Sequence, residues 1–336
     1  MLTFPPGKLP LEFMHKLLSR YAVDDERLVA GPGIGVDVAV IDNGDRYMVI
    51  KTDPITFATD QIGWYAVNIN ANDIATSGAQ PLWMLNAVLL PEQGTTAALV
   101  EEIFTQIHAA CRAIGVTAVG GHTEVVHDLP RPIVVGVMIG EVAKDRLLTT
   151  QGMQVGDAIV LVKSIPIEAT AIIAREKAAV LRERGVPEET IARAQHYLYD
   201  PGISLLAPAR LAANCPGVHA MHDPTEGGLA SGLHEVALAA HTGIEVWAEA
   251  ISVAPEGQLL CDLLGLDVLG TIASGALIVA VAAEQADTLL AALRASDYPA
   301  AVIGRATPAD EGRVLVRGGQ RLPLPEFARD EIARIF

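Results

Sequence analysis

The sequence predicts an α/β or α+β protein of two domains, and two observations lead to this fold class. Segments with the spacing of strands and of helices alternate through both halves of the chain. The length of 336 residues exceeds the roughly 250–300 residues at which a single hydrophobic core stops growing. A polar, glycine-containing connector covers residues 144–156. We therefore expect an N-terminal domain at 1–148 and a C-terminal domain at 156–336.

The elements of the first half follow from apolar spacing and from turn residues. A helix is expected over 9–22, because Leu11, Met14 and Leu18 recur at helical spacing. Two strands flank Asn43-Gly44, a dipeptide that is a strong hairpin turn signal. The patterns predict these strands at 36–41 and 47–53, further strands at 81–90, 117–120 and 133–141, and helices at 62–77 and 95–115.

The second half repeats the alternation. An alanine-rich helix is expected over 168–184, after a strand at 157–162. The remaining patterns predict helices at 203–213, 228–241 and 284–294, and strands at 244–247, 276–281 and 301–305. No low-complexity segment interrupts the chain. Because 51% of the residues are apolar, the sequence is not that of a disordered protein.

The acidic composition narrows the class of partner. The chain carries 40 Asp plus Glu against 24 Lys plus Arg, a formal net charge of −16. Nucleic-acid binding depends on clustered basic residues, so we expect no nucleic-acid partner. A nucleotide can still bind an acidic protein through a metal ion.

The expected location is the cytoplasm. No run of about 18 apolar residues predicts a membrane span, and the N-terminus lacks the pattern of a signal peptide. Cys111, Cys215 and Cys261 are odd in number and far apart, without a CxxC pair. This pattern favours buried thiols in a reducing compartment over disulfides or a zinc site.

Three aspartates are the first candidates for chemistry. Asp37 lies in an apolar strand pattern, Asp53 ends the next strand, and Asp73 lies among small apolar residues of an expected helix. An unpaired carboxylate is costly in such surroundings. Oxygen ligands on separate elements are what Mg²⁺ requires when it carries phosphates. A metal site and a set of paired structural carboxylates both account for the pattern.

Glycine-rich segments offer candidate phosphate contacts. Gly31, Gly33 and Gly35 precede a strand, and they lack the Lys-Ser/Thr ending of a P-loop. The segment 120–124, GGHTE, follows a strand, so it places polar groups at a sheet edge or forms a plain turn. In the segment 223–228, DPTEGG, the glycines lead into a helix whose N-terminus suits an anion. The alternative there is an ordinary N-cap.

The order of these motifs resembles the aminoimidazole ribonucleotide (AIR) synthase superfamily. The motifs are GVDVAV, TDPI, NDIA with a following GA-x-P, GGHTE and DPTEGGL, and the resemblance spans about 28–310. That superfamily includes AIR synthase, thiamine-monophosphate kinase, selenophosphate synthetase and the hydrogenase maturation protein HypE. The segments HDPTEGGLASGLHEVA and LLGLDVLGTIASGALIVAV are most similar to HypE. The segment QIGWYAVNINANDIATSGAQPLW also resembles thiamine-monophosphate kinase.

The resemblance implies a fold and an activity. The N-terminal sheet would pair with that of a second subunit in a barrel-like homodimer core, followed by a C-terminal α/β domain. ATP would lie in a cleft between the domains with Mg²⁺ on aspartates. The activity would be phosphoryl transfer to an amide-type or other oxygen of a separate small substrate. A non-catalytic nucleotide-binding paralogue and a thiamine-monophosphate kinase-like phosphotransferase are the alternatives.

The resemblance also assigns roles by motif position. Three positions are catalytic candidates, namely Lys51, Asp53 and His122. The metal candidates are Asp37, Asp53, Asp73 and Glu124. The nucleotide-binding candidates are Gly31, Gly33, Gly35, Asn72, Gly120, Gly121, Thr123, Asp223, Thr225, Gly227 and Gly228.

Several positions depart from the superfamily pattern. Val36 replaces the first acid of a GDDAA pair, and His122 replaces an aspartate after the double glycine. Glu226 stands where HypE has arginine, and the chain ends DEIARIF without the terminal cysteine that carries the group dehydrated in HypE. Lys51 shares a strand face with Asp53, and it either compensates for lost phosphate contacts or is a solvated lysine. The departures favour the non-catalytic paralogue, whereas the retained motifs favour the enzyme.

Overall fold

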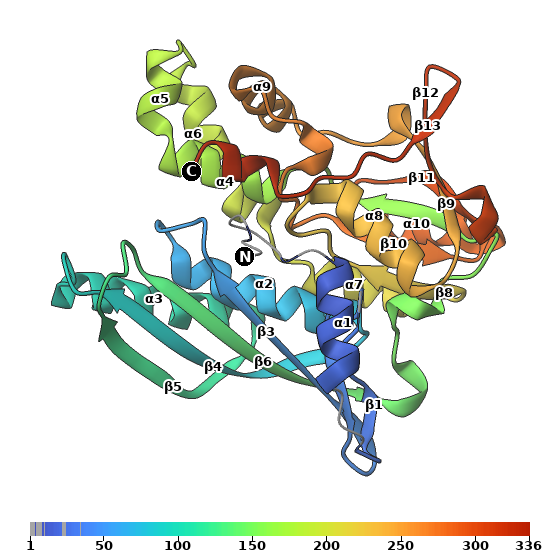
Figure 1. Ribbon diagram of the computed structural model, residues 1–336, viewed down its shortest axis with the longest axis horizontal. Helices are drawn as coiled ribbons and strands as arrows, with labels where there is room; N and C mark the ends of the chain where they lie inside the picture. The colour runs from blue at the N-terminus through green and yellow to red at the C-terminus, as the bar shows by residue number, and fades with distance from the viewer. Residues whose placement is uncertain (1–3, 5–8, 10, 22–24, 34) are drawn as a thin grey trace.

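Two mixed sheets account for the alternation of strands and helices in the sequence (Figure 1). The computed structural model describes residues 4, 9, 11–21, 25–33 and 35–336. The N-terminal sheet has the order β1-β2-β3-β6-β4-β5, and the C-terminal sheet has the order β13-β12-β9-β11-β7-β10-β8. The prediction of a two-domain α/β protein is confirmed. The expected connector 144–156 lies between the last strand of the first sheet and the first strand of the second.

The N-terminal elements largely follow the sequence pattern. They are α1 (Leu11–Tyr21), β1 (Leu28–Ala30), β2 (Ala39–Asp42), β3 (Arg46–Ile55), α2 (Ile62–Thr76), β4 (Gln80–Pro91), α3 (Ala97–Ile114), β5 (Thr117–Val126) and β6 (Ile133–Ala143). Residues 10 and 22 of the expected first helix lie outside the described residues. Two expectations were wrong. β2 begins only at Ala39, so Asp37 precedes the strand, and β5 continues through GGHTEV because that segment pairs with β4 along its length.

The C-terminal domain contains more elements than the sequence predicted. They are β7 (Ala158–Val162), α4 (Ile167–Glu176), α5 (Ala178–Glu183), α6 (Glu188–His196), α7 (Leu206–Ala213), β8 (Val218–His222), α8 (Gly228–Ala239), β9 (Gly243–Trp247), α9 (Pro255–Leu264), β10 (Leu277–Val281), α10 (Ala286–Arg294), β11 (Ala300–Thr307), β12 (Arg313–Arg317) and β13 (Gln320–Pro323). In the described part of the chain, no helix has the length and apolarity needed to cross a membrane.

The expected single helix over 168–184 was wrong. It is two helices, α4 and α5, which part at Lys177 with φ −116° and ψ 19°. The break lies directly after the residues of α4 that contact the N-terminal domain. The Glu176 carboxylate accepts the backbone N–H groups of Thr59 and Asp60 at 2.7 and 3.1 Å. Arg175 pairs with the Asp60 carboxylate at 2.5 Å. These long-range contacts left no local signal in the sequence.

Helix α2 is the central element of the molecule. It lies between the N-terminal sheet and the C-terminal domain (Figure 1), and Trp64 is its only residue that is not buried. Small residues permit this close packing. A Cβ at Gly63 would lie 2.7 Å from the Ile103 carbonyl of α3, so only glycine fits there. A helix buried on all sides can present polar side chains to both domains at once.

The face of the N-terminal sheet that points away from α2 is apolar and half-exposed. Along β6, residues 134, 138 and 142 are buried on the helix side, whereas Val135, Val137 and Ile139 alternate onto the other face. Strand pairing places Val137 between Thr52 and Leu85 in a row. The edge strand β5 is exposed along nearly its whole length. An apolar sheet face of this kind favours association with another surface.

We predict that the protein forms a homodimer through this sheet face. A stable interface should bury more than about 2,000 Å² in total. Val137→Arg places a charge at the centre of the face and should convert the dimer to a monomer at micromolar concentration, because an unpaired charge in an apolar interface is costly. Light scattering measures the mass. Val155→Arg, an exposed position in the connector, is the control. A monomeric wild-type mass would contradict the prediction.

Candidate functional site

Lys51 lies at the centre of a group of aspartates between the domains. Its Nζ is 3.2 Å from Asp53 Oδ2 and 3.2 Å from Asp73 Oδ1. Residues 51 and 53 share a face of β3, and α2 packs on that face with Asp73. Burial by itself would lower the pKa of Lys51, but the carboxylates of Asp73 and Asp53 outweigh it and raise the pKa well above its usual value. Lys51 is therefore a buried ammonium and not a solvated surface lysine.

A second cation, His222, bridges the glycine-rich loop to the C-terminal domain. Its Nδ1 lies 2.7 Å from Asp37 Oδ2, and its Nε2 lies 3.0 Å from Glu235 Oε2. Burial disfavours the imidazolium, but the Asp37 and Glu235 carboxylates raise the pKa of His222 well above its usual value. Both ring nitrogens then donate hydrogen bonds. His222 thus fixes the orientation of Asp37 and has no nitrogen left for a metal.

Asp223 is the most deeply buried carboxylate of the group. It is 1% exposed, and neither carboxylate oxygen has a hydrogen-bond partner in the part of the chain that the structure describes. Burial, together with the charge of Asp37, raises its pKa to about 7. One ligand atom each from Asp37, His222 and Asp223 lie within 4.8 Å of one another. No described residue forms a hydrogen bond with Asp73 Oδ2 either, and burial raises the pKa of that carboxyl well above its usual value.

These groups fit a divalent cation better than they fit a closed salt-bridge network. Among the described residues, four aspartates face two cationic side chains, and three of their buried oxygens have no hydrogen-bond partner. Buried polar atoms are normally hydrogen-bonded, so orphaned oxygens in one place indicate an absent partner. The residues that could hold a cation are Asp37, Asp53, Asp73 and Asp223. Carboxylate oxygens suit a hard ion such as Mg²⁺.

The glycine-rich loop lies beside this group. Gly35 has φ +68°, and a Cβ there would lie 2.7 Å from the Glu235 carbonyl of α8. Its own carbonyl accepts a hydrogen bond from the Thr150 hydroxyl. Gly31 and Asp37 line a cavity of about 190 Å³ next to the connector. Gly33 accepts the Val36 N–H, which closes the turn. The predicted phosphate loop is thus adjacent to Asp37.

In this structure a carboxylate of the chain is bound at the N-terminus of α8. The Gly227 N–H donates to Asp330 Oδ2 at 2.6 Å. Gly228 has φ +66°, and a Cβ there would lie 2.5 Å from the Leu269 carbonyl, so the double glycine permits close packing. The anion expected at this helix is supplied by the chain itself. Thr225 accepts the Gly228 N–H through its carbonyl and lines a small cavity with Asp53.

Asn72 joins the domains next to Asp73. Its amide donates to the Ile203 carbonyl at 2.9 Å and accepts the Leu205 N–H at 2.8 Å. Both ends of the side chain are therefore used between domains, which fixes α2 relative to the segment before α7.

The GGHTE residues are not brought to the aspartates within one chain. Gly120, Gly121, His122, Thr123 and Glu124 lie on β5, and β4 and β6 separate this strand from β3. His122 Nε2 is 3.4 Å from Glu124 Oε2, and both side chains are exposed. Gly121 pairs with Asn86, Asn86 pairs with Gly136, and Gly136 pairs with Asp53. Gly121 and Asp53 therefore lie in the same row across the sheet. The catalytic and metal roles of His122 and Glu124 stay predictions.

Glu168 is a residue that the sequence analysis missed. It is 4% exposed, and its Oε2 has no hydrogen-bond partner among the residues that the structure describes. It lines a small cavity together with Asp53, Thr225 and Ser274. Burial raises its pKa to about 8. Glu168 is thus a protonated carboxylic acid at neutral pH beside the aspartate group. A charge within the apolar run IEATAIIA was the available signal, as it was for Asp73.

Comparison with known proteins identifies the family. The AIR synthase related protein N-terminal domain matches residues 35–142, and the corresponding C-terminal domain matches residues 154–317. The chain belongs to the AIR synthase-related family. This confirms the resemblance carried by the GVDVAV, TDPI and DPTEGGL motifs.

The most similar relatives include HypE proteins. The chain is 33% identical over 290 residues to carbamoyl dehydratase HypE of Rhodobacter capsulatus, covering 83% of this chain and 79% of the relative. The crystal structure of Escherichia coli HypE is 26% identical, with a TM-score of 0.74 over 97% of this chain and 99% of the other.

Two structures with the same fold contain nucleotides. A HypE structure in complex with ATP has a TM-score of 0.70 at 24% identity, covering 94% of this chain and 90% of the other. A ThiL structure complexed with AMPPCP and TMP has a TM-score of 0.72 at 18% identity, covering 95% and 94%. These two proteins of the same fold thus bind ATP or an ATP analogue.

Replacing Glu168 by glutamine should remove a pH-dependent loss of stability. A carboxyl whose pKa is about 8 when folded, against a usual 4.5, stabilises the fold below pH 4.5, and that contribution is lost as the pH rises towards 8. The free energy of unfolding of Glu168→Gln, relative to that of wild type, should rise by on the order of 3 kcal/mol from pH 5 to pH 8. Urea unfolding at the two pH values measures this gain.

The control is Glu284→Gln, an exposed position that should show no such gain. If the difference in free energy of unfolding between wild type and Glu168→Gln stays constant across this pH range, Glu168 is ionised in the folded protein.

Proposed function

We propose that this protein is an ATP- and Mg²⁺-dependent, HypE-like enzyme that activates an amide-type or other oxygen of a small substrate by phosphoryl transfer. The observation that carries the proposal is the group of Asp37, Asp53, Asp73 and Asp223 between the domains, in which three buried oxygens accept no hydrogen bond from any described residue. Phosphoryl transfer depends mainly on positioning and on neutralising charge. An array of carboxylates and cations suits that task.

Magnesium would be held by the aspartates, with His222 orienting Asp37. When bound, the ion would neutralise phosphate charge and attach the nucleotide to an otherwise acidic site. Because the pKa of Asp223 is about 7, a proton must leave this carboxyl for it to bind a cation, so divalent-ion affinity should rise between pH 6 and pH 8.

Lys51 and Glu168 would act on the transferred group and the acceptor. Lys51 is the only lysine within 4 Å of these aspartates among the described residues, and its ammonium can bind a phosphate oxygen as a point charge. Glu168 borders the Asp53 side of the site, where a protonated carboxyl can donate a hydrogen bond to an acceptor oxygen. The acceptor end of the substrate would therefore lie near Glu168 and Thr225.

Two assays separate this proposal from its alternatives. A thermal-shift screen with ATP, ADP and Mg²⁺ tests nucleotide binding, because a bound ligand raises the melting temperature. A phosphate-release assay over amide-type and thiamine-type metabolites then tests turnover. Phosphate release with an amide supports the HypE-like enzyme. Formation of ADP with transfer of the phosphoryl group to a thiamine phosphate, without release of inorganic phosphate, supports the kinase. Binding without turnover on any acceptor would point to the non-catalytic paralogue.

Asp53→Asn should weaken Mg²⁺-dependent ATP binding far more than it weakens the fold. Asparagine is nearly isosteric, but it lacks the charge that attracts the ion. The dissociation constant for Mg·ATP should rise about tenfold or more, on the order of 1.4 kcal/mol. Calorimetric titration measures the affinity. Asp45→Asn, in the exposed turn of the same hairpin, is the control. An unchanged affinity in Asp53→Asn would show that Asp53 does not hold the ion.

A further inference from the structure

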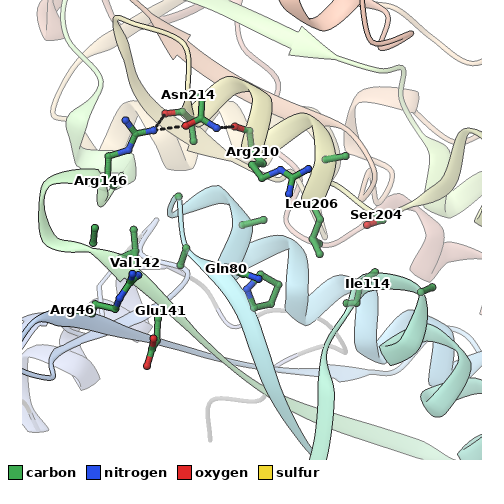
Figure 2. Close-up of a pocket in the computed structure, with 18 residues that line it drawn as sticks. Arg46, Gln80, Ile114, Glu141, Val142, Arg146, Ser204, Leu206, Arg210 and Asn214 are labelled. Carbon is green, nitrogen blue, oxygen red and sulfur yellow. Dashed lines mark hydrogen bonds between the residues drawn. The ribbon is translucent and has the colours of Figure 1, made fainter.

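A second inter-domain pocket lies at the C-terminal end of α2. Its volume is about 550 Å³, within the range of small-molecule sites. The starts of β3 and β4 and the end of β6 form one side, and α7 with the preceding Ser204 forms the other (Figure 2). None of the aspartates near Lys51 lines it. The pocket is therefore distinct from the candidate nucleotide site.

The charged lining of this pocket is mainly basic. Among the described residues, Arg46, Arg146 and Arg210 line it against one acid, Glu141, in a chain whose net charge is −16. Figure 2 shows Arg46 and Glu141 on the sheet side and the other two arginines on the opposite side. Arg146 is held in place, since its Nη2 lies 2.6 Å from Asn214 Oδ1 and 3.0 Å from the Ala213 carbonyl.

The other two arginines have their guanidinium groups available. Among the described residues, neither Arg46 nor Arg210 makes an ion pair or a side-chain hydrogen bond. By contrast, Arg175, Arg182 and Arg193 all pair with carboxylates. A guanidinium is a planar fork that matches the oxygens of a phosphate or a carboxylate. Two such groups facing one cavity favour a dianion.

The rest of the lining is apolar and would contact the body of a ligand. Pro81, Ile114 and Leu206 contribute the larger apolar side chains, and several alanines complete the wall. A bare inorganic anion would leave this surface without a partner. The combination fits an organic molecule that carries a dianionic group at one end.

We propose that this pocket binds a small organic dianion, a phosphate monoester or a dicarboxylate, between Arg46 and Arg210. The ligand would contact α2 two residues beyond Asp73 and the start of α7, whose preceding segment is bonded to Asn72. It would therefore bridge the two domains, and binding should raise the melting temperature.

Calorimetric titration of the full chain with phenyl phosphate, in EDTA, tests the site. EDTA prevents metal-bridged binding at the aspartates. Saturable binding is expected, with an affinity at least tenfold weaker in the double variant Arg46→Gln/Arg210→Gln. Arg112→Gln, exposed on α3 beside the pocket but outside its lining, should stay within twofold of wild type and controls for a general loss of charge.

Further probes identify the chemical class of the ligand. Phthalate replacing phenyl phosphate at equal or better affinity would assign a dicarboxylate, and weaker phthalate binding would assign a phosphate ester. Phenol should not bind. Equal affinity for phenol, unsaturable binding, or an equal loss in Arg112→Gln would overturn the proposal. If the double variant melts earlier than wild type, the single variants Arg46→Gln and Arg210→Gln, each expected to weaken binding severalfold, provide the test.

Discussion

The burial of several carboxylates at one inter-domain junction is the constraint on which this molecule depends. Asp37, Asp73 and Asp223 lie on three separate elements, yet they converge around Lys51 and His222. Removing such charges from water costs several kcal/mol each unless cations or hydrogen bonds compensate. Two buried cationic side chains offset part of this cost. The oxygens that no described residue contacts by a hydrogen bond are those that a metal ion would bind in the proposed function.

The domain junction holds these charges in place through contacts that are independent of the aspartates. Glu176 forms a hydrogen bond with the backbone before α2, and Asn72 forms one with the backbone before α7. The helix that carries Asp73 is therefore fixed at both ends. Lys163 of the C-terminal domain donates hydrogen bonds to the Gly202 and Ser204 carbonyls at 2.9 Å, which fixes the segment before α7. The site is thereby preorganised on rigid elements, which electrostatic catalysis requires.

The sequence was most informative where a residue contradicted its local pattern. Asp73 in a small apolar helix and Asp37 beside an apolar strand were found because a charge there is physically anomalous. The partners of those residues were not found, since the bond between His222 and Asp37 joins positions 185 residues apart. Glu235 and Glu168 likewise lie on helices whose register against the site only the tertiary fold determines. The break between α4 and α5 was missed for the same reason.

The proposed chemistry depends on where the metal lies. A crystal soaked with Mn²⁺ and a non-hydrolysable ATP analogue would locate the ion through its anomalous scattering, because Mn²⁺ accepts the same oxygen ligands as Mg²⁺. The account predicts a peak bonded to carboxylate oxygens from the group Asp37, Asp53, Asp73 and Asp223, with the terminal phosphate beside Lys51. A nucleotide bound without an ion at these aspartates, or an ion bound elsewhere in the chain, would contradict it.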